Sequence, residues 1–167
     1  MAIAVNVAGL TPIYVGTGVS GALEFLGYTR DGANHVGEAA FLNVPGDEHG
    51  GQEGTPIEVQ YLGEVGRVRL ELTKYDKAVF AKVRARCLEA TDGTPYTAGT
   101  LMLANSKFMR LLANAPSDPH NYPCAIPRGT IELNTGTKFS MAICEFECHK
   151  HPTSGVLRDN TVTGVPK

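Results

Sequence analysis

The sequence lacks a surplus of basic residues and any long apolar run. Its 167 residues hold 15 Lys and Arg against 17 Asp and Glu, for a formal net charge of -2. This balance excludes a surface that clamps nucleic acid through the phosphates. No apolar stretch approaches the roughly 20 residues of a membrane-spanning helix, and the first residues lack the basic and apolar regions of a signal peptide. We therefore expect a protein that is made in the cytosol and does not enter a membrane.

Catalytic signatures are also missing. The chain contains no G-x-S-x-G, no H-E-x-x-H and no paired Cys/His signature of a nucleophilic enzyme. The GTG at Gly16 to Gly18 lacks the lysine of a phosphate-binding loop. Asp47-Glu48-His49 lies in a glycine-rich stretch, where polar contacts explain it better than acid–base chemistry. The sequence therefore predicts neither an enzyme nor a cofactor-binding protein.

Thiols and imidazoles near the C-terminus raise the alternative of a zinc-stabilised binding module. Cys144, Cys148, His149 and His151 are ligand types that zinc prefers. Their spacing is not C-x-x-C, and His149 would lie on the strand face opposite to Cys148. We therefore expect no metal, and interpret the cluster as two core thiols beside two exposed histidines.

Glycine and proline are abundant and spread along the chain, with 19 Gly and 10 Pro beside 43% hydrophobic residues. This pattern predicts many short elements and turns around a real core, and hence a mainly β fold. We expect one domain over residues 1–167, a β-barrel or sandwich with one flanking α-helix. Its extended parts would be an N-terminal arm at 1–20 with a weak strand at 11–15, a long loop at 44–56 and a C-terminal extension at 150–167, polar and mobile after Pro152.

Strands are predicted from alternation. Between Arg67 and Thr73 every second residue is apolar, as in a half-buried strand. The segment 57–73 is the clearest strand, and others are expected at 22–29, 36–44, 100–103, 108–112, 129–133 and 138–148. A turn is expected at 30–32, a proline-rich loop at 116–127 and a hairpin turn at 134–136.

One helix is expected from about Lys74 to Ala90. An apolar stripe runs along it, formed by Val79, Phe80, Val83 and Cys87. Thr73 is the expected N-cap, and Asp76 in the first turn suits the helix dipole.

Three segments in a fixed order resemble phage tail tube proteins. They are Leu26-Gly-Tyr-Thr-Arg-Asp-Gly32, Val44-Pro-Gly-Asp-Glu-His-Gly-Gly51 and Gln60-Tyr-Leu-Gly-Glu64, the last followed by a strand and a helix that opens at Tyr-Asp76. The closing region, with Ile131-Glu-Leu-Asn, Thr137-Lys-Phe and Phe146-Glu-Cys, also looks like the last sheet of such a protein. The resemblance covers about residues 11 to 150 and lies in the order of the segments. The cysteines are not a feature of the family at large.

The resemblance implies a structural subunit of a bacteriophage tail tube. Six copies would form a ring, and rings would stack into a conduit through which phage DNA passes without specific binding. Sheath, baseplate and tail terminator proteins would be further partners, and the virion tail, assembled in the host cytoplasm, its location. An alternative is a capsid decoration or cement protein, or another virion structural protein such as one like a tail terminator. The loop implied to reach the next ring holds Pro45, Gly46, Asp47, Glu48, His49, Gly50 and Gly51.

A conduit for DNA should present a mixed but net acidic wall, because a basic one would hold the phosphates. Outward-facing carboxylates on the predicted strands are the candidates. They are Glu71, Glu132, Glu145 and Glu147.

The cysteines leave two outcomes open. A virion leaves the reducing cytosol, so a disulfide can form among Cys87, Cys124, Cys144 and Cys148; otherwise all four stay reduced. Cys144 and Cys148 are about 13 Å apart along one strand, too far to pair with each other. Cys124, in a segment expected to be exposed, is the candidate for a bridge between subunits.

Overall fold

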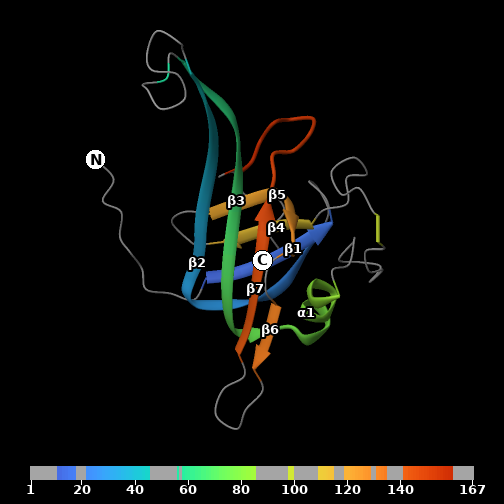
Figure 1. The fold of residues 1–167 in the computed structure, drawn as a ribbon. Helices are drawn as coiled ribbons and strands as arrows, with labels where there is room; N and C mark the ends of the chain where they lie inside the picture. Colours follow the sequence, from blue (N-terminus) through green and yellow to red (C-terminus); the bar gives the residue numbers. More distant parts are fainter. Residues whose placement is uncertain are drawn as a thin grey trace, which may run out of the picture.

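The computed structural model describes residues 11–17, 22–45, 56, 58–85, 98–99, 109–114, 119–128, 131–134 and 141–159. Strands dominate this part of the chain (Figure 1), which confirms the predicted mainly β fold with a flanking helix. The elements are β1 (Thr11–Thr17), β2 (Leu23–Val44), β3 (Glu58–Tyr75), α1 (Lys77–Arg84), β4 (Met109–Asn114), β5 (Pro119–Ile126), β6 (Ile131–Asn134) and β7 (Met141–Cys148). Among the described residues, no helix has the length and apolar character needed to cross a membrane.

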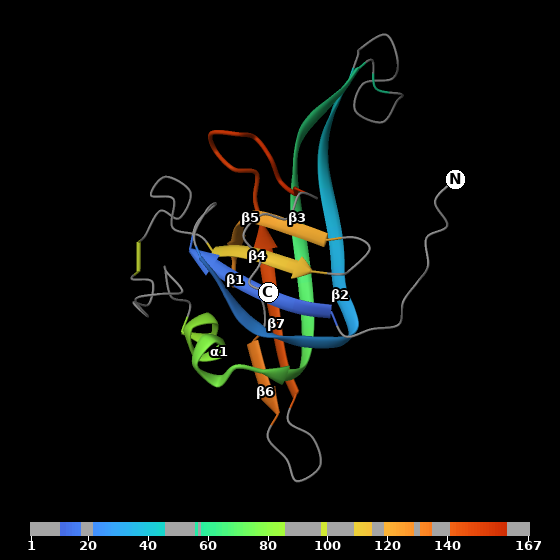
Figure 2. The ribbon, with the colours of Figure 1, turned by 180° about the vertical axis from the view of Figure 1, so that it is seen from behind.

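The strands form one antiparallel sheet that closes on itself. Their order is β3-β2-β1-β4-β5-β7-β6, and β3 also pairs with β7, from Gly66–Cys148 to Leu72–Ala142. The strands β1, β2, β3, β7, β5 and β4 therefore form a barrel, with β6 attached to β7 (Figures 1 and 2). Closure of this kind removes most unpaired sheet edges. The strand expected at 11–15 is β1, which lies in the barrel between β2 and β4.

Alternate residues of the strands fill the barrel. Val68 and Leu70 of β3 lie opposite Phe146 and Cys144 of β7, and all four are 1% exposed or less. The inward faces predicted for these two strands are therefore confirmed. Other strands and the helix complete the same core through Ile13, Val15, Leu26, Leu111, Ala113, Val79, Phe80 and Val83.

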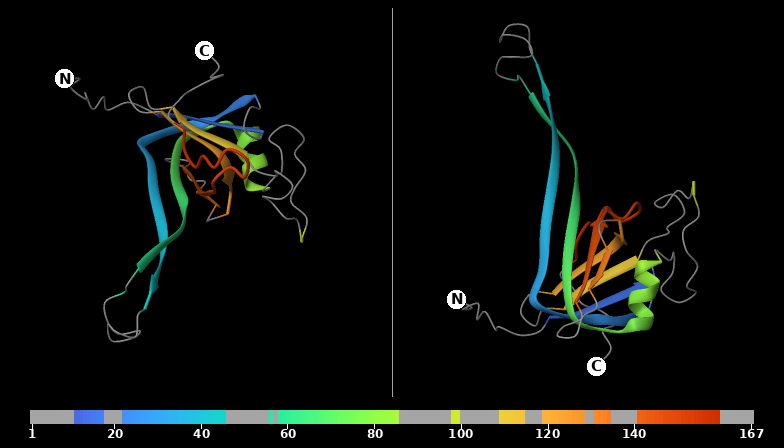
Figure 3. Two further views of the ribbon diagram at one scale, coloured as in Figure 1. Left: turned by 90° about the horizontal axis from the view of Figure 1, so that it is seen from above. Right: turned by 60° about the horizontal axis from the view of Figure 1, so that its bottom comes forward.

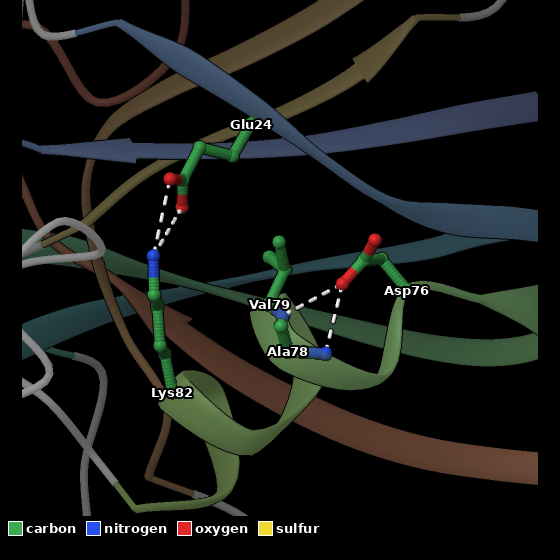
Figure 4. Close-up of polar contacts among 5 residues, drawn as sticks. All are labelled: Glu24, Asp76, Ala78, Val79 and Lys82. Atoms are coloured by element: carbon green, nitrogen blue, oxygen red, sulfur yellow. Dashed lines mark hydrogen bonds and ion pairs between the residues drawn. The ribbon is translucent and has the colours of Figure 1, made fainter.

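The helix begins later than predicted. Its N-cap is Asp76 and not Thr73, because Oδ1 of Asp76 accepts hydrogen bonds from the N–H groups of Ala78 at 2.8 Å and Val79 at 3.0 Å (Figure 4). Thr73 belongs to β3, which continues to Tyr75. The predicted apolar stripe is confirmed for its described members, since Val79, Phe80 and Val83 are buried; Cys87 lies outside the described residues. Lys82 also contacts Glu24 of β2 at 3.1 Å (Figure 4).

The turn expected at 30–32 is a bulge within a single long strand. Thr29 lies opposite Leu72 and the next paired residue, Ala33, lies opposite Leu70, so β2 holds extra residues at this point. Gly32 takes a φ of +82°, which glycine adopts without strain. At this region β2 bends sharply (Figure 3). Bulges bend strands, so the turn signal marks a change of direction and not a chain reversal.

The prediction of a loop at 116–127 is wrong, because β5 occupies most of this segment. Asn121 to Ala125 are buried. The two prolines of the strand are placed where a missing N–H does little harm. Pro119 is the first residue of β5, and Pro123 lies where the register with β4 shifts. The antiparallel pairing of the two closing strands is confirmed, but the turn does not begin at Asn134, which belongs to β6 and pairs with Met141 of β7; residues 135 and 136 of the expected turn lie outside the described residues.

Candidate functional site

The strands β2 and β3 continue beyond the barrel as a projecting two-stranded ribbon (Figures 1 and 3). They pair as far as Val44 and Glu58. The pairing of β3 with β7 stops at Gly66, and that of β2 with β1 stops at Thr29. Beyond these points each strand has only the other as a strand partner within the described residues. We call residues 36–44 and 58–65 the projecting hairpin.

The projecting hairpin exposes large apolar side chains to solvent. Phe41 is 60% exposed, Leu62 58% and Tyr61 48%. Contiguous apolar groups of this kind mark interaction surfaces, because monomeric proteins rarely leave them open. In the described part of the chain, Val156 is the one exposed large hydrophobic residue outside the hairpin; the remaining ones within it are Val36, Leu42 and Val59.

Apolar side chains lie on both faces of the projecting hairpin. Phe41 is directly opposite Tyr61, with ring centroids 5.5 Å apart. Leu42, the next residue, lies opposite Gln60 and points to the other face. An isolated two-stranded hairpin is marginally stable in water. Cover from another molecule would therefore stabilise this one.

A bulge lies in the middle of the projecting hairpin, at Leu62. Ala40 pairs with Gly63 and Phe41 with Tyr61, so Leu62 is the extra residue. Gly63 has a φ of +138°, which favours glycine. The strand predicted at 57–73 therefore continues through this point, and the bulge re-aims the exposed Leu62.

The expected inter-ring loop belongs to the tip of the same hairpin. Pro45 directly follows β2 and is exposed. The other residues proposed to reach a neighbour, Gly46, Asp47, Glu48, His49, Gly50 and Gly51, lie outside the described residues. The outer ends of β2 and β3, between which this loop runs in the sequence, project away from the barrel (Figure 3).

The four carboxylates predicted to line a wall lie together on the outer face of the barrel. Glu147 and Glu145 of β7 are opposite Arg67 and Arg69 of β3. Glu71 and Glu132 are each opposite Ile143, from either side of β7. Residues directly opposite in an antiparallel sheet share a face, so these acids form one surface across β3, β7 and β6.

Arginines interleave with these carboxylates. Arg67 contacts Glu38 at 3.3 Å, and Arg69 contacts Glu71 at 3.5 Å. The Glu147 side chain is only 14% exposed and contacts both Arg128 at 2.6 Å and His149 at 2.9 Å. A hollow of about 440 Å³ lies among these side chains. Exposed ion pairs contribute little to stability, so their main effect here is to balance the charge of the surface.

The cysteine expectations need correction. Cys124 is fully buried in β5 and not exposed, so it is not accessible to another subunit in this structure. Cys124, Cys144 and Cys148 are free thiols, and Cys87 lies outside the described residues. Their environment makes them unreactive, because a thiol needs to ionise to attack or pair.

Burial sets the acidity of these thiols. It raises the pKa of Cys124 to about 11. Burial and, to a lesser degree, the charge of Glu145 raise the pKa of Cys144 to about 12. For Cys148, burial comes first and the neighbouring Cys124 and Glu147 add to it, so its pKa is also raised well above the ordinary value. All three thiols are therefore protonated near neutral pH.

The possible zinc ligands are directed to different places. Cys144 and Cys148 are part of the core, whereas His149 contacts Glu147. Nδ1 of His151 accepts backbone hydrogen bonds from Thr153 at 3.3 Å and Ser154 at 3.2 Å. Within the described residues, no group of three or more His, Cys, Asp or Glu side chains could hold a metal ion.

The segment after β7 is held against the barrel, where a mobile tail was expected after Pro152. The N–H of His149 donates to the carbonyl of Cys124 at 2.9 Å, and Asp159 exchanges two backbone hydrogen bonds with Asn121. We call residues 149–159 the strap. It lies beside β3 at the base of the projecting hairpin (Figures 1 and 2), and its residues 156–158 line a hollow with residues 35–37 of β2.

Sequence reasoning missed the exposed apolar side chains and the strap. A signal for the first was present, because Ala39-Ala-Phe-Leu42 and Val59-Gln-Tyr-Leu62 do not alternate and so place apolar residues on both faces. Glycine, proline and serine near the strap favoured a loop, and nothing local indicated its pairing with β5. No protein-family model matches this chain, and no curated protein matches it in sequence.

Proposed function

We propose that this protein is a structural subunit of a bacteriophage tail tube, in which hexameric rings stack into a conduit for genome delivery. The observation that carries the proposal is the projecting hairpin, with Phe41, Tyr61 and Leu62 exposed on paired strands outside the barrel. A monomer gains nothing from such a surface, whereas a polymer buries it at every contact. The order of sequence segments that resembles tail tube proteins supports the same conclusion.

The shape of the subunit supports a head-to-tail contact between copies. The projecting hairpin leaves one end of the barrel, and the β6–β7 hairpin lies toward the opposite end (Figure 1). A contact between two different surfaces of identical subunits repeats from copy to copy, and with a translation it generates a stack. The tip loop, residues 46–55, would then meet the next ring.

The outer face of β3, β7 and β6 supports a role as the wall of the conduit. On these three strands the carboxylates Glu71, Glu132, Glu145 and Glu147 outnumber the guanidinium groups of Arg67 and Arg69. Such a mixed surface would repel phosphates weakly and let DNA slide. The DNA would pass without specific binding.

Sheath, baseplate and tail terminator proteins would be the other partners, and the subunit would assemble in the host cytoplasm and remain in the virion tail. The absence of catalytic and metal signatures in the sequence fits a structural role. It fits a capsid decoration or cement protein equally well, which is the alternative. The exposed hairpin favours a polymer, because it carries apolar side chains on both faces. A decoration protein needs only one docking face.

Electron microscopy of the purified protein after concentration tests the proposal. Long tubes support the tail tube subunit. Knobs that bind only when capsids are added favour the decoration protein. A dispersed monomer under all assembly conditions contradicts the proposal.

A further inference from the structure

The strap contacts the projecting hairpin at its aromatic face. Nζ of Lys150 lies 5.2 Å from the centroid of the Tyr61 ring and 3.3 Å from its hydroxyl oxygen. Tyr61 packs in turn against Phe41, with the two rings tilted by 54°. The ammonium group therefore sits on one half of the exposed aromatic pair.

The same lysine lies where the barrel sheet opens. Strand β7 ends at Cys148, opposite Gly66, and from Val65 outward the described residues supply no strand to this side of β3. Lys150 follows β7 by two residues and lies over this open edge. Lysine on or beside an edge strand discourages another chain from pairing with it.

The strap is held at both ends and also at Leu157, which packs against the core. Its ends are tied to β5 through Cys124 and Asn121. Between them His151 closes a compact turn, because its N–H donates to Val156 at 2.9 Å and its carbonyl accepts from Gly155 at 2.8 Å. Residues 152–156 are exposed. Lys150 is itself exposed, so its side chain can leave Tyr61 while the strap and the barrel stay folded.

We infer that the strap guards the projecting hairpin of the unassembled subunit, and that a second copy of this chain displaces Lys150 from Tyr61 when it docks. The inference rests on the proposed self-assembly of the subunit. It supplies one contact at the aromatic pair that a second copy breaks when it docks. An exposed contact between a cation and an aromatic ring is weak, so docking overcomes the guard readily.

The test replaces Lys150 and measures the rate of self-association. Lys150→Met keeps a long side chain of similar reach but removes the charge, whereas Lys150→Arg keeps the contact with the ring. Lys77→Met makes the same change at an exposed position of α1, away from the hairpin. Sedimentation and light scattering should show association of Lys150→Met about two- to fivefold faster than wild type, the factor that corresponds to an exposed cation–π contact. Lys150→Arg and Lys77→Met should match wild type.

The inference is overturned if Lys150→Met associates at the wild-type rate. It is equally overturned if Lys77→Met accelerates association as much, because net charge alone would then explain the effect. Microscopy of the same samples separates the two proposals. Faster association of Lys150→Met into particles that are not tubes keeps the guard and contradicts the tail tube. Tubes formed equally fast by all variants keep the tail tube and contradict the guard.

Discussion

Phe41 of β2 lies directly opposite Tyr61 of β3, with their rings 5.5 Å apart, on two strands that have already left the barrel. Cross-strand aromatic pairs stabilise a hairpin, yet these two side chains remain 60% and 48% exposed. The pair therefore holds the ribbon in register while leaving most of its apolar area for another molecule.

Replacement of this pair should abolish assembly and leave the fold intact. We expect Phe41→Ser with Tyr61→Ser to change the free energy of unfolding by at most about 1 kcal/mol, because exposed substitutions have small effects. The variant should sediment as a monomer at concentrations where wild type polymerises. Lys77→Ser, at an exposed position of α1 away from the hairpin, is the control and should still polymerise. Polymerisation of the double variant would contradict the assigned interface.

Removal of the hairpin tip should separate folding from stacking. We expect deletion of residues 47 to 52 to leave a folded subunit that no longer forms tubes, because these residues are polar or glycine and carry no apolar side chain that a core would need. Circular dichroism checks the fold and negative-stain microscopy checks the tubes. Normal tubes from the deletion would show that the tip does not join rings.

The helix cap gives a prediction that is independent of function. Asp76→Ala removes the side chain that accepts from Ala78 and Val79, and should lower the free energy of unfolding by about 1 kcal/mol. Thr73→Ala should cost less, because Thr73 donates one long hydrogen bond of 3.3 Å to the carbonyl of Tyr28 and caps nothing. Denaturant unfolding of both variants measures the difference. A larger loss of stability for Thr73→Ala would contradict the assignment of Asp76 as the N-cap.

The buried thiols predict a pH dependence. Folding raises the pKa of Cys124 from 9.0 to about 11 and that of Cys144 from 9.0 to about 12. Below pH 9 the folded and the unfolded protein both keep these thiol protons, so the contribution of the protons to stability is fully present. Above pH 9 the unfolded chain ionises first, and this contribution is lost. Stability should therefore fall between about pH 9 and pH 12.

Thiol titration checks the same burial directly. In a Cys87→Ser background, the native protein at neutral pH should react slowly with a thiol reagent and become fully reactive on unfolding. Rapid reaction of the native protein would show that the strands around Cys124 and Cys148 are open. A disulfide-linked dimer band on a non-reducing gel is not expected, because none of the described cysteines reaches the surface.

Strand periodicity made the barrel predictable, and turn signals misled where glycine serves a bulge. Val68, Leu70 and Leu72 are every second residue of β3 and share the face that points into the barrel. This inward face was therefore predictable from the sequence alone. Gly32 and Gly63 have positive φ values, which glycine adopts both in turns and in bulges. The sequence alone does not show which of the two a glycine forms. Strand β5 was missed because its prolines suggest a loop, although register shifts and strand ends accommodate them.

The candidate site was only half predictable for a related reason. The carboxylates Glu71, Glu145 and Glu147 follow from alternation, and the structure places them on one face with Glu132. The contact of Lys150 with Tyr61 joins residues far apart in the chain, which no local pattern encodes. The exposure of Phe41 depends on how far β2 extends past β1, which is a property of the whole sheet.

Averaged end-on images of particles assembled from the purified wild-type protein test the central claim most directly. We predict hollow rings with sixfold symmetry, together with side views of tubes built from stacked rings. Solid fibres, closed oligomers that do not stack, or rings of another symmetry would contradict the tail tube account.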